Sequence, residues 1–470
     1  MRRAPARGLS ILSAIAAAVI GPIPAQASVS GPTMLGTLGG DESCAIEIVD
    51  SGRILGVSKR TNAAFDSNAF LFVPGSGIID FDATNSYTPP GDINAAGDSL
   101  AGFALRTVGG TVTKSGVLIG PLTRPTRLND RGDLAGSFFD AQNHQHAMVW
   151  NAATGIRDLG SFAGFGAEVT AINELGQAVG VYKTAFSEPR GFFADPVAGV
   201  TDLGLFAPTP SRNAINDAAQ VIGQDAIGAA LWQPGVGITR IEGLAAAGTN
   251  PMAINEQGEV AGFTRLPPGN NRVFAWSEDT GPLDTGMIGI PFDINDHGQI
   301  VGATTLGPAF VWDRATGATS LPSLPGIPFP RSSAASANNL GQIAGCTQVP
   351  GSLVHLQAAT WSVPVTVQIH WTAAEYARLQ QISGFYGSTT AELPKVGVAA
   401  IAFIIGLIPS PTPTPIVLDP AGTDVTQTIV WQPDELVYLE KVKERFALDD
   451  EDAHRFAVAL LGYLAAIQGH

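Results

Sequence analysis

A short motif recurs eight times along this chain and constrains the fold more than any other feature of the sequence. It consists of an apolar run, Ile-Asn, two variable residues, Gly, a polar residue, two apolar residues and Gly, as in residues 172–180. Successive copies lie 45, 35, 44, 43, 39, 40 and 43 residues apart, which indicates a repeat of about 40 residues with insertions in its loops. The Asn position is held by Val49, Asn94, Asn129, Asn173, Asn216, Asn255, Asn295 and Asn338.

Each copy of the motif predicts a β-hairpin. Asn begins a turn by hydrogen-bonding its own backbone, and Gly supplies positive φ at little steric cost. Val49 departs from this pattern in the first repeat, and Ala219 replaces the turn Gly of the fifth. A third apolar strand follows each hairpin, as at residues 147–150, and a fourth follows a Gly-containing turn, as at residues 158–160. Four short strands per repeat are typical of one β-propeller blade.

We therefore expect residues 33–363 to form an all-β propeller of eight four-stranded blades. The eighth repeat ends at its third strand, near Trp361, while an unused strand at residues 34–39 precedes the first repeat. Donation of that strand to the last blade would close the ring and remove an open sheet edge. An open β-solenoid is the competing architecture, and a four-strand unit of this length favours the propeller.

The third and fourth strands carry a family resemblance. His146, Ala147 and Met148, the Asp-Leu-Gly of residues 158–160 and the Ile-Asn hairpins resemble the HAF repeat family of extracellular proteins. The resemblance covers residues 33–363. It implies an extracellular or cell-surface repeat protein, and it supplies neither catalytic residues nor a ligand.

Residues 1–27 have the pattern of an export signal. Arg2, Arg3 and Arg7 precede an apolar run at residues 9–21, and Ala-Gln-Ala at residues 25–27 forms a small-x-small cleavage site. A membrane anchor is the alternative, but the run is shorter than the roughly 20 residues that span a bilayer. We expect an exported protein in the periplasm, in the medium or on the cell surface, with no transmembrane segment in the mature chain.

The two cysteines predict a disulfide across the ring closure. Cys44 lies five residues before Val49, and Cys346 lies eight residues after Asn338. In a hairpin whose turn runs from Asn to Gly these positions lie opposite each other, so both cysteines are expected at the hairpin end away from the turn. The first and eighth repeats are neighbours only in a closed ring. Two buried free thiols are the alternative, because neighbouring blades can hold the Cα atoms beyond the roughly 7 Å limit for a disulfide.

The C-terminal part has a different organisation. Residues 364–408 and 428–470 are expected to form two strand-helix-helix units, separated by a Pro-rich linker at residues 409–427. This layout resembles the ribbon-helix-helix fold, which dimerises through its strand and binds DNA. The outward strand positions Gln368 and His370 lack the cations of a DNA-reading ribbon, so we interpret the resemblance as architectural. Association through this domain stays open, and the apolar residues 396–408 are expected to form a buried helix that is too short to span a bilayer.

The sequence supplies no catalytic, cofactor or metal motif: it has no Gly-x-Ser-x-Gly elbow, His-Glu-x-x-His pair or phosphate loop. His144 and His146 lie near Asp140, but His146 occupies a repeat position, which explains it without a metal. The carboxylates beside the turns recur with the repeat and are expected to be solvated turn residues; they are Asp130, Glu174, Asp217, Glu256 and Asp296.

These observations favour a non-catalytic secreted scaffold that binds a protein or a glycan through one propeller face. The formal net charge of −15 argues against a nucleic-acid partner. The alternative function is a propeller-fold hydrolase or lyase acting on a polysaccharide, since two carboxylates can meet across a propeller face. Carboxylates with perturbed pKa values at one mouth of the ring would distinguish the two functions.

Overall fold

The computed structural model describes residues 29–467 except 64–65, 83–87, 163–165, 185–188, 246–247, 306, 328–329, 353, 387–393, 396, 399–424, 432 and 447. The expected export signal, residues 1–27, therefore lies outside the described residues. Two compact units, Val29–Ser362 and Val363–His470, make up the rest of the chain. Within the described residues no helix is both long and apolar enough to cross a bilayer.

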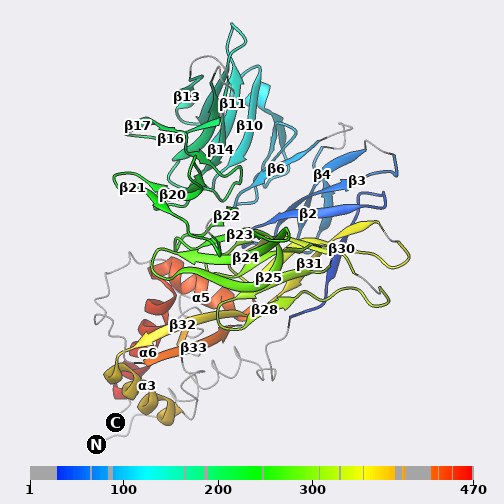
Figure 1. Ribbon diagram of the computed structural model, residues 1–470. Helices are drawn as coiled ribbons and strands as arrows, with labels where there is room; N and C mark the ends of the chain where they lie inside the picture. The colour runs from blue at the N-terminus through cyan, green and yellow to red at the C-terminus, as the bar shows by residue number, and fades with distance from the viewer. Residues whose placement is uncertain are drawn as a thin grey trace, which may run out of the picture. The chain divides into compact units, whose positions relative to one another are not determined.

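The larger unit consists of antiparallel sheets of short strands that follow the repeats (Figure 1). The first four repeats form β2 (Ser43–Ile48), β3 (Ile54–Lys59), β4 (Ser67–Val73) and β5 (Gly77–Asp80); β6 (Pro90–Ile93), β7 (Ser99–Ala101), β8 (Ala104–Arg106) and β9 (Val112–Lys114), with the short helix α2 (Ser115–Leu118); β10 (Thr123–Leu128), β11 (Leu134–Phe139), β12 (Gln145–Asn151) and β13 (Gly155–Gly160); and β14 (Ala167–Ile172), β15 (Ala178–Lys183), β16 (Pro189–Asp195) and β17 (Gly199–Gly204).

The last four repeats form β18 (Ala207–Pro208), β19 (Val221–Gln224), β20 (Ala229–Gln233) and β21 (Gly237–Arg240); β22 (Thr249–Ile254), β23 (Val260–Leu266), β24 (Asn270–Ser277) and β25 (Gly281–Ile294); β26 (Ile300–Thr304), β27 (Ala309–Asp313) and β28 (Gly317–Ser320); and β29 (Ser332–Ala337), β30 (Gln342–Gln348) and β31 (Leu356–Ser362). The long strand β25 serves two repeats, because its first half pairs with β24 and its second half with β26. Among the described residues the larger unit thus has six four-stranded sheets and one seven-stranded sheet.

The motif forms the expected hairpins. In the fourth repeat Ile172 pairs with Ala178, and the N–H of Gly176 donates to the carbonyl of Asn173 across the turn at 3.1 Å. Gly176 has a φ of +76°, a conformation that side chains with a Cβ rarely adopt. Ala219 adopts a φ of +58° at the same position of the fifth repeat, so the repeat imposes this conformation even on a residue that disfavours it.

The last Gly of the motif makes room for an aromatic ring. A Cβ added at Gly180 would lie 2.5 Å from Cζ of Phe192, and one at Gly262 would lie 2.5 Å from Cζ of Phe274. Both rings are fully buried. The small residue on the second strand and the aromatic residue on the third are therefore a packing pair, which explains why both recur with the repeat.

The N-terminal strand completes the sheet of the last repeat. β1 (Thr33–Gly36) pairs antiparallel with β31, with Thr33 opposite Thr360 and Met34 opposite Ala359. This confirms the prediction that an N-terminal strand joins the last repeat. Figure 1 shows the blue strand β2 of the first repeat beside the yellow strand β30 of the last, and these two strands pack together.

A disulfide joins these two repeats. Cys44 and Cys346 are bonded, with their Cα atoms 4.8 Å apart and a sequence separation of 302. Cys44 lies opposite Val57 and Cys346 opposite Ser333, at the hairpin end away from the turn. The predicted disulfide is confirmed, and the alternative of two free thiols is wrong.

The smaller unit pairs two strands and packs helices against them. β32 (Val365–Trp371) and β33 (Val425–Trp431) form an antiparallel ribbon. The helix α3 (Ala373–Tyr386) follows β32 in the chain, and α5 (Pro433–Phe446) and α6 (Asp450–Ile467) follow β33. The main chain N–H of Thr372 donates to Glu375, and that of Glu375 donates to the Thr372 hydroxyl, a reciprocal cap at the start of α3.

The expected linker, residues 409–427, ends earlier than predicted. The strand β33 begins at Val425, which lies inside the expected linker. It begins there because Val425 still pairs with Trp371 of β32. The remainder of that linker, residues 409–424, and nearly all of the apolar residues 396–408 lie outside the described residues.

Candidate functional site

The Asn side chains of the motif link neighbouring repeats. Asn173 is 4% exposed; its Nδ2 donates to the carbonyl of Asn216 at 3.0 Å, and its Oδ1 accepts the N–H of Gln177 at 2.9 Å. The same inter-repeat bond recurs from Asn94 to Asn129 (3.2 Å), Asn129 to Asn173 (2.9 Å), Asn216 to Asn255 (3.0 Å), Asn255 to Asn295 (3.0 Å), Asn295 to Asn338 (2.9 Å) and Asn338 to Val49 (3.1 Å). We call this series the asparagine belt; its last bond returns to the first repeat.

A second series of bonds runs beside the first. The main-chain N–H of the residue after each motif Asn donates to the side chain of the equivalent residue in the next repeat. We call this series the carboxylate belt. Its bonds run from Ala95 to Asp130 (2.6 Å), Asp130 to Glu174 (2.6 Å), Glu174 to Asp217 (2.9 Å), Asp217 to Glu256 (2.9 Å), Glu256 to Asp296 (3.0 Å), Asp296 to Asn339 (2.9 Å) and Asn339 to Asp50 (2.9 Å). The turn carboxylates, expected to be merely solvated, therefore act as acceptors between repeats.

Both belts lack a bond at the same junction. The side chain of Val49 has no amide group that could donate to the carbonyl of Asn94. The side chain of Ala95 has no carboxylate that could accept a hydrogen bond from the first repeat. Within the described residues every other junction between successive repeats carries both bonds. The junction of repeats 1 and 2 is therefore chemically different from the others.

A pocket of about 300 Å³ opens among the belts. Its lining includes Val49, Asp50 and Ala95 from the belts, and a set of side chains deeper inside, namely Glu47, Asp92, Arg212, Asn213, Asp293 and Ser336. Glu47, Asp92, Asp293 and Ser336 all lie two residues before the Asn position of their repeat. In each of these inner strands a β-bulge falls immediately before that residue, which re-aims its side chain.

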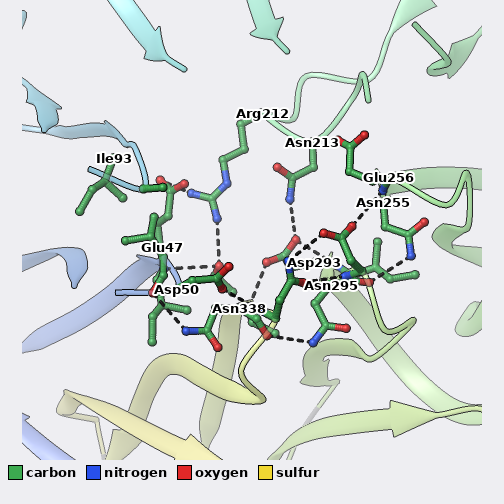
Figure 2. Close-up of a pocket in the computed structure, with 18 of the residues that line it drawn as sticks. Glu47, Asp50, Ile93, Arg212, Asn213, Asn255, Glu256, Asp293, Asn295 and Asn338 are labelled. Carbon is green, nitrogen blue, oxygen red and sulfur yellow. Dashed lines mark hydrogen bonds and ion pairs between the residues drawn. The ribbon is translucent and has the colours of Figure 1, made fainter. Parts of the chain in front are cut away.

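The fifth repeat sends a cation into this pocket. Its inner strand β18 has only two residues, and the segment after it leaves the sheet. The guanidinium of Arg212 forms an ion pair with Glu47 of the first repeat and donates to Oγ of Ser336 in the eighth repeat at 3.1 Å. Asn213 donates to Asp293 of the seventh repeat at 2.5 Å. Figure 2 shows Arg212 and Asn213 extending from one segment towards these acidic partners.

The remaining carboxylates are held by backbone donors. Asp92 accepts the N–H groups of Ile93 at 3.1 Å and Leu128 at 3.0 Å, and Asp293 accepts that of Ala337 at 3.0 Å. Three acidic side chains thus surround a single arginine in this part of the pocket.

Several carboxyl groups around this pocket have shifted pKa values. Burial raises the pKa of Glu47 well above its usual range, against the opposing charge of Arg212, and burial also raises the pKa of Asp293. In the carboxylate belt, burial and then neighbouring Asp130 raise the pKa of Glu174 to about 7. Burial likewise raises the pKa of Glu256 to about 7. Perturbed carboxyl groups therefore do gather around one pocket.

The two histidines of the third repeat lie beside carboxylates. Nδ1 of His146 lies 2.9 Å from Asp158, and Asp140 lies 3.2 Å from His144 and 3.4 Å from His146. His146 and Asp158 are the polar residues of the two strand signatures, so the signatures mark a cross-strand pair. This contact explains His146 without a metal ion.

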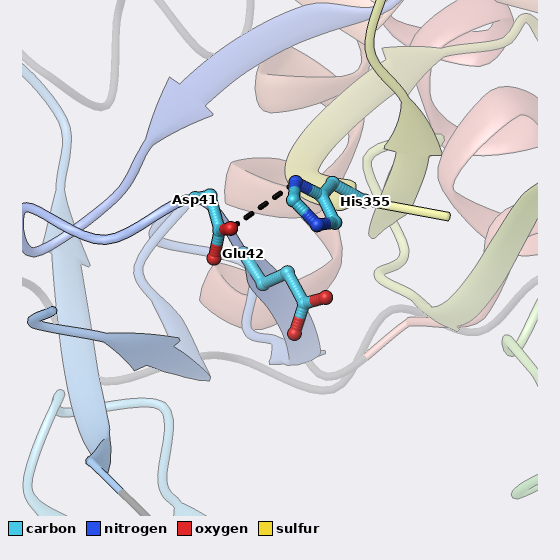
Figure 3. A group of neighbouring side chains, drawn as sticks. All are labelled: Asp41, Glu42 and His355. Atoms are coloured by element: carbon cyan, nitrogen blue, oxygen red, sulfur yellow. Dashed lines mark ion pairs between the residues drawn. The ribbon is translucent and has the colours of Figure 1, made fainter. Parts of the chain in front are cut away.

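A second cluster lies beside the disulfide. Nδ1 of His355 is 3.2 Å from Asp41, and Glu42 lies close by (Figure 3). The ammonium of Lys59 is 2.7 Å from Glu42 and 3.8 Å from Asp41. The ammonium of Lys59 therefore already pairs with both carboxylates, and we assign no metal here.

Sequence reasoning identified the turn residues but missed the deeper ones. A comparison of the repeats two residues before each Asn would have revealed them, since this position holds Glu47, Asp92, Arg127, Asp293 and Ser336 in five repeats and alanine in the other three, Ala171, Ala214 and Ala253. Arg212 and Asn213 lie outside that register and carry no repeat signal.

No protein-family model matches the chain, and no characterised protein matches it in sequence. Among solved structures it is similar to TolB from Acinetobacter baumannii, with 13% identity over 58% of this chain and 62% of that chain and a TM-score of 0.33. It is also similar to the β-propeller domain of the Trilobed protease from Pyrococcus furiosus (9% identity, 71% and 95% covered, TM-score 0.38) and to the BP39L lectin from Burkholderia pseudomallei (10%, 68% and 98%, 0.31). The chain thus spans about three fifths of the length of TolB. Similarity at this level carries no information about ligand or activity.

Proposed function

We propose that this protein is an exported scaffold of the HAF repeat type, built on a closed eight-bladed propeller. It binds a positively charged group of a protein partner in the pocket among the two belts, which we call the turn-face pocket. The single observation that carries this proposal is the composition of the pocket. Glu47, Asp92 and Asp293 surround one guanidinium, and the carboxylate belt adds further acidic groups at the rim.

Three contacts support the closed ring. Asn338 donates to the carbonyl of Val49, β1 completes the sheet of β29 to β31, and the Cys44–Cys346 bond joins the same two repeats. Each links the last repeat to the first, which an open solenoid would leave far apart. The disulfide also supports export, since such bonds persist in oxidising compartments.

The chemistry of the lining favours a cationic protein segment over a glycan. Of the described residues that line the pocket, none is aromatic, so it lacks the flat apolar platform on which sugar rings stack. Arg212 shows that a guanidinium fits among these carboxylates. An acidic cleft also raises the local concentration of cationic partners.

Binding of an arginine-rich peptide to the secreted protein tests the proposal. We expect Asp293→Asn to weaken binding by about tenfold, the effect of one lost charge-assisted contact. Asp279→Asn, which removes an exposed carboxylate in the turn between β24 and β25, is the matched control and should bind like the wild type. Equal binding by both variants, or equal binding of a glutamate-rich peptide, would refute the proposal.

The polysaccharide hydrolase or lyase is the second candidate. It is favoured by the gathering of carboxyl groups with raised pKa values around this pocket, among them Glu174, whose pKa of about 7 suits a general acid near neutral pH. Release of reducing ends or of unsaturated sugars from acidic and neutral polysaccharides would establish this activity. Its loss in Glu174→Gln, with binding of the arginine-rich peptide retained, would assign the role to that carboxyl group.

A further inference from the structure

The missing bonds between repeats 1 and 2 suggest where the ligand binds. We propose that an arginine side chain of the partner enters the turn-face pocket at this junction and supplies the N–H donor that Val49 lacks. This inference rests on the proposed binding of a cationic group and specifies both its position and its chemistry.

The repeat pattern defines the place of the missing donor. At the other junctions an Asn amide reaches the carbonyl of the next motif Asn, at distances of 2.9–3.2 Å. The equivalent acceptor at this junction is the carbonyl of Asn94, and the side chain opposite it is the isopropyl group of Val49. A ligand N–H at that point would make the bond that the repeat makes elsewhere.

The junction is also open to the pocket. Val49 lines the pocket from one side, and Ile93 and Ala95, which flank Asn94 in the chain, line it from the other. Ala95 is exposed and carries only a methyl group where six other repeats carry a carboxylate. The two departures from the repeat therefore remove a donor and free space at one point.

Acidic groups line this point on the side of the pocket, whereas the side chain of Arg53 of the first repeat lies against Gly97 in the turn of the second. Asp50 follows Val49 at the rim, Glu47 lies two residues before it, and Asp92 and Asp130 line the pocket from the second and third repeats. Backbone donors fix Asp92, and Arg212 holds Glu47. A donor that binds here meets a carbonyl and carboxylates together, so the site selects a donor that is also positively charged.

Guanidinium fits this requirement better than ammonium. Its planar fork presents several N–H groups in fixed directions, so it reaches a carbonyl and a carboxylate at once, whereas ammonium acts as a point charge. We therefore expect arginine peptides to bind more tightly than lysine peptides of the same length and charge.

The double variant Val49→Asn, Ala95→Asp tests the position, because it restores both belts. The restored bonds should raise the melting temperature of the larger unit. The affinity for the peptide acetyl-Gly-Arg-Gly-amide, measured by calorimetry, should fall at least tenfold, since the new side chains occupy the site. Simple charge attraction predicts the opposite result, because Ala95→Asp adds a negative charge. Ala152→Asp, at an exposed turn, controls for the added charge and should bind like the wild type.

The outcomes separate this inference from the function on which it rests. If the wild type binds neither arginine nor lysine peptides, the proposed function fails. If the wild type binds and the double variant binds equally or more tightly, the cation lies elsewhere in the pocket and only the inferred position is refuted. A double variant that melts below the wild type would show that the new side chains do not join the belts, and it would overturn the geometry of the vacancy.

Discussion

Truncation of one belt asparagine should destabilise the larger unit measurably. In Asn295→Ala the protein loses two bonds donated by Nδ2, to the carbonyl of Asn338 at 2.9 Å and to Gln299 at 3.0 Å. It also loses two bonds accepted by Oδ1, from the N–H groups of Gln299 at 3.0 Å and His297 at 3.2 Å. Buried hydrogen bonds contribute about 0.5–1.5 kcal/mol each. Because the carbonyl of Asn338 keeps the N–H of Gly341 as a donor, we expect a loss of about 2–4 kcal/mol.

Urea unfolding monitored by tryptophan fluorescence measures this loss. The midpoint should fall while the slope stays constant, since the truncation changes stability and not the surface exposed on unfolding. The transition of the larger unit is identified by its sensitivity to reductant, because this unit contains the Cys44–Cys346 bond. Asn270→Ala, at an exposed position on the far end of a hairpin, is the control. A loss below about 1 kcal/mol at Asn295, or one equal to that at Asn270, would refute the structural role of the belt.

Three further outcomes follow from the structure. The double variant Cys44→Ala, Cys346→Ala should lower the free energy of unfolding by about 3–5 kcal/mol. Thiol titration of the unfolded, unreduced wild type should detect neither cysteine, and two reactive thiols per chain would contradict the bond. Since the pKa of Glu174 is raised from 4.5 to about 7, the folded state holds its proton more tightly than the unfolded state, so the free energy of unfolding should fall as pH rises from about 4.5 to 7. In melting curves, Glu174→Gln should reduce this dependence of stability on pH, and an unchanged dependence would count against the shift. Burial lowers the pKa of His454 from 6.5 to about 4, so the smaller unit should lose up to about 3 kcal/mol as pH falls through that interval, and His454→Gln should abolish the dependence; a loss of equal size in the variant would assign it to another group.

Local sequence determined the hairpins, the N-terminal strand and the disulfide. A turn from Asn to Gly depends on a few adjacent residues, so its position can be predicted wherever the pattern occurs. Once the turn is placed, antiparallel pairing sets the register, and this register puts Cys44 and Cys346 at the same distance from the turns of their hairpins. The reciprocal cap of Thr372 and Glu375 was predictable for the same reason, since its partners are three residues apart.

The roles of the turn residues depended on contacts between repeats. Asn was predicted to form its own turn, and it does, but its Nδ2 also donates to the next repeat, from Asn173 to Asn216 for example. The carboxylates beside the turns were predicted to be solvated, whereas Glu174 accepts an N–H from Asp130. Sequence spacing does not encode the rotation between neighbouring sheets, and this rotation decides which atoms lie within bonding distance.

Only the tertiary structure decided the contents of the pocket. Arg212 lies in a segment that breaks the repeat, and its partners Glu47 and Ser336 come from the first and last repeats. Whether such side chains converge depends on how far each inner strand projects, which the bulges and the shortened β18 set in three dimensions. The sequence alone determined where the pattern fails, at Val49 and Ala95, because a missing amide or carboxylate is visible in the chain itself. That the two departures meet at one junction beside an acidic pocket is a consequence of the fold, which brings turns about 45 residues apart into contact.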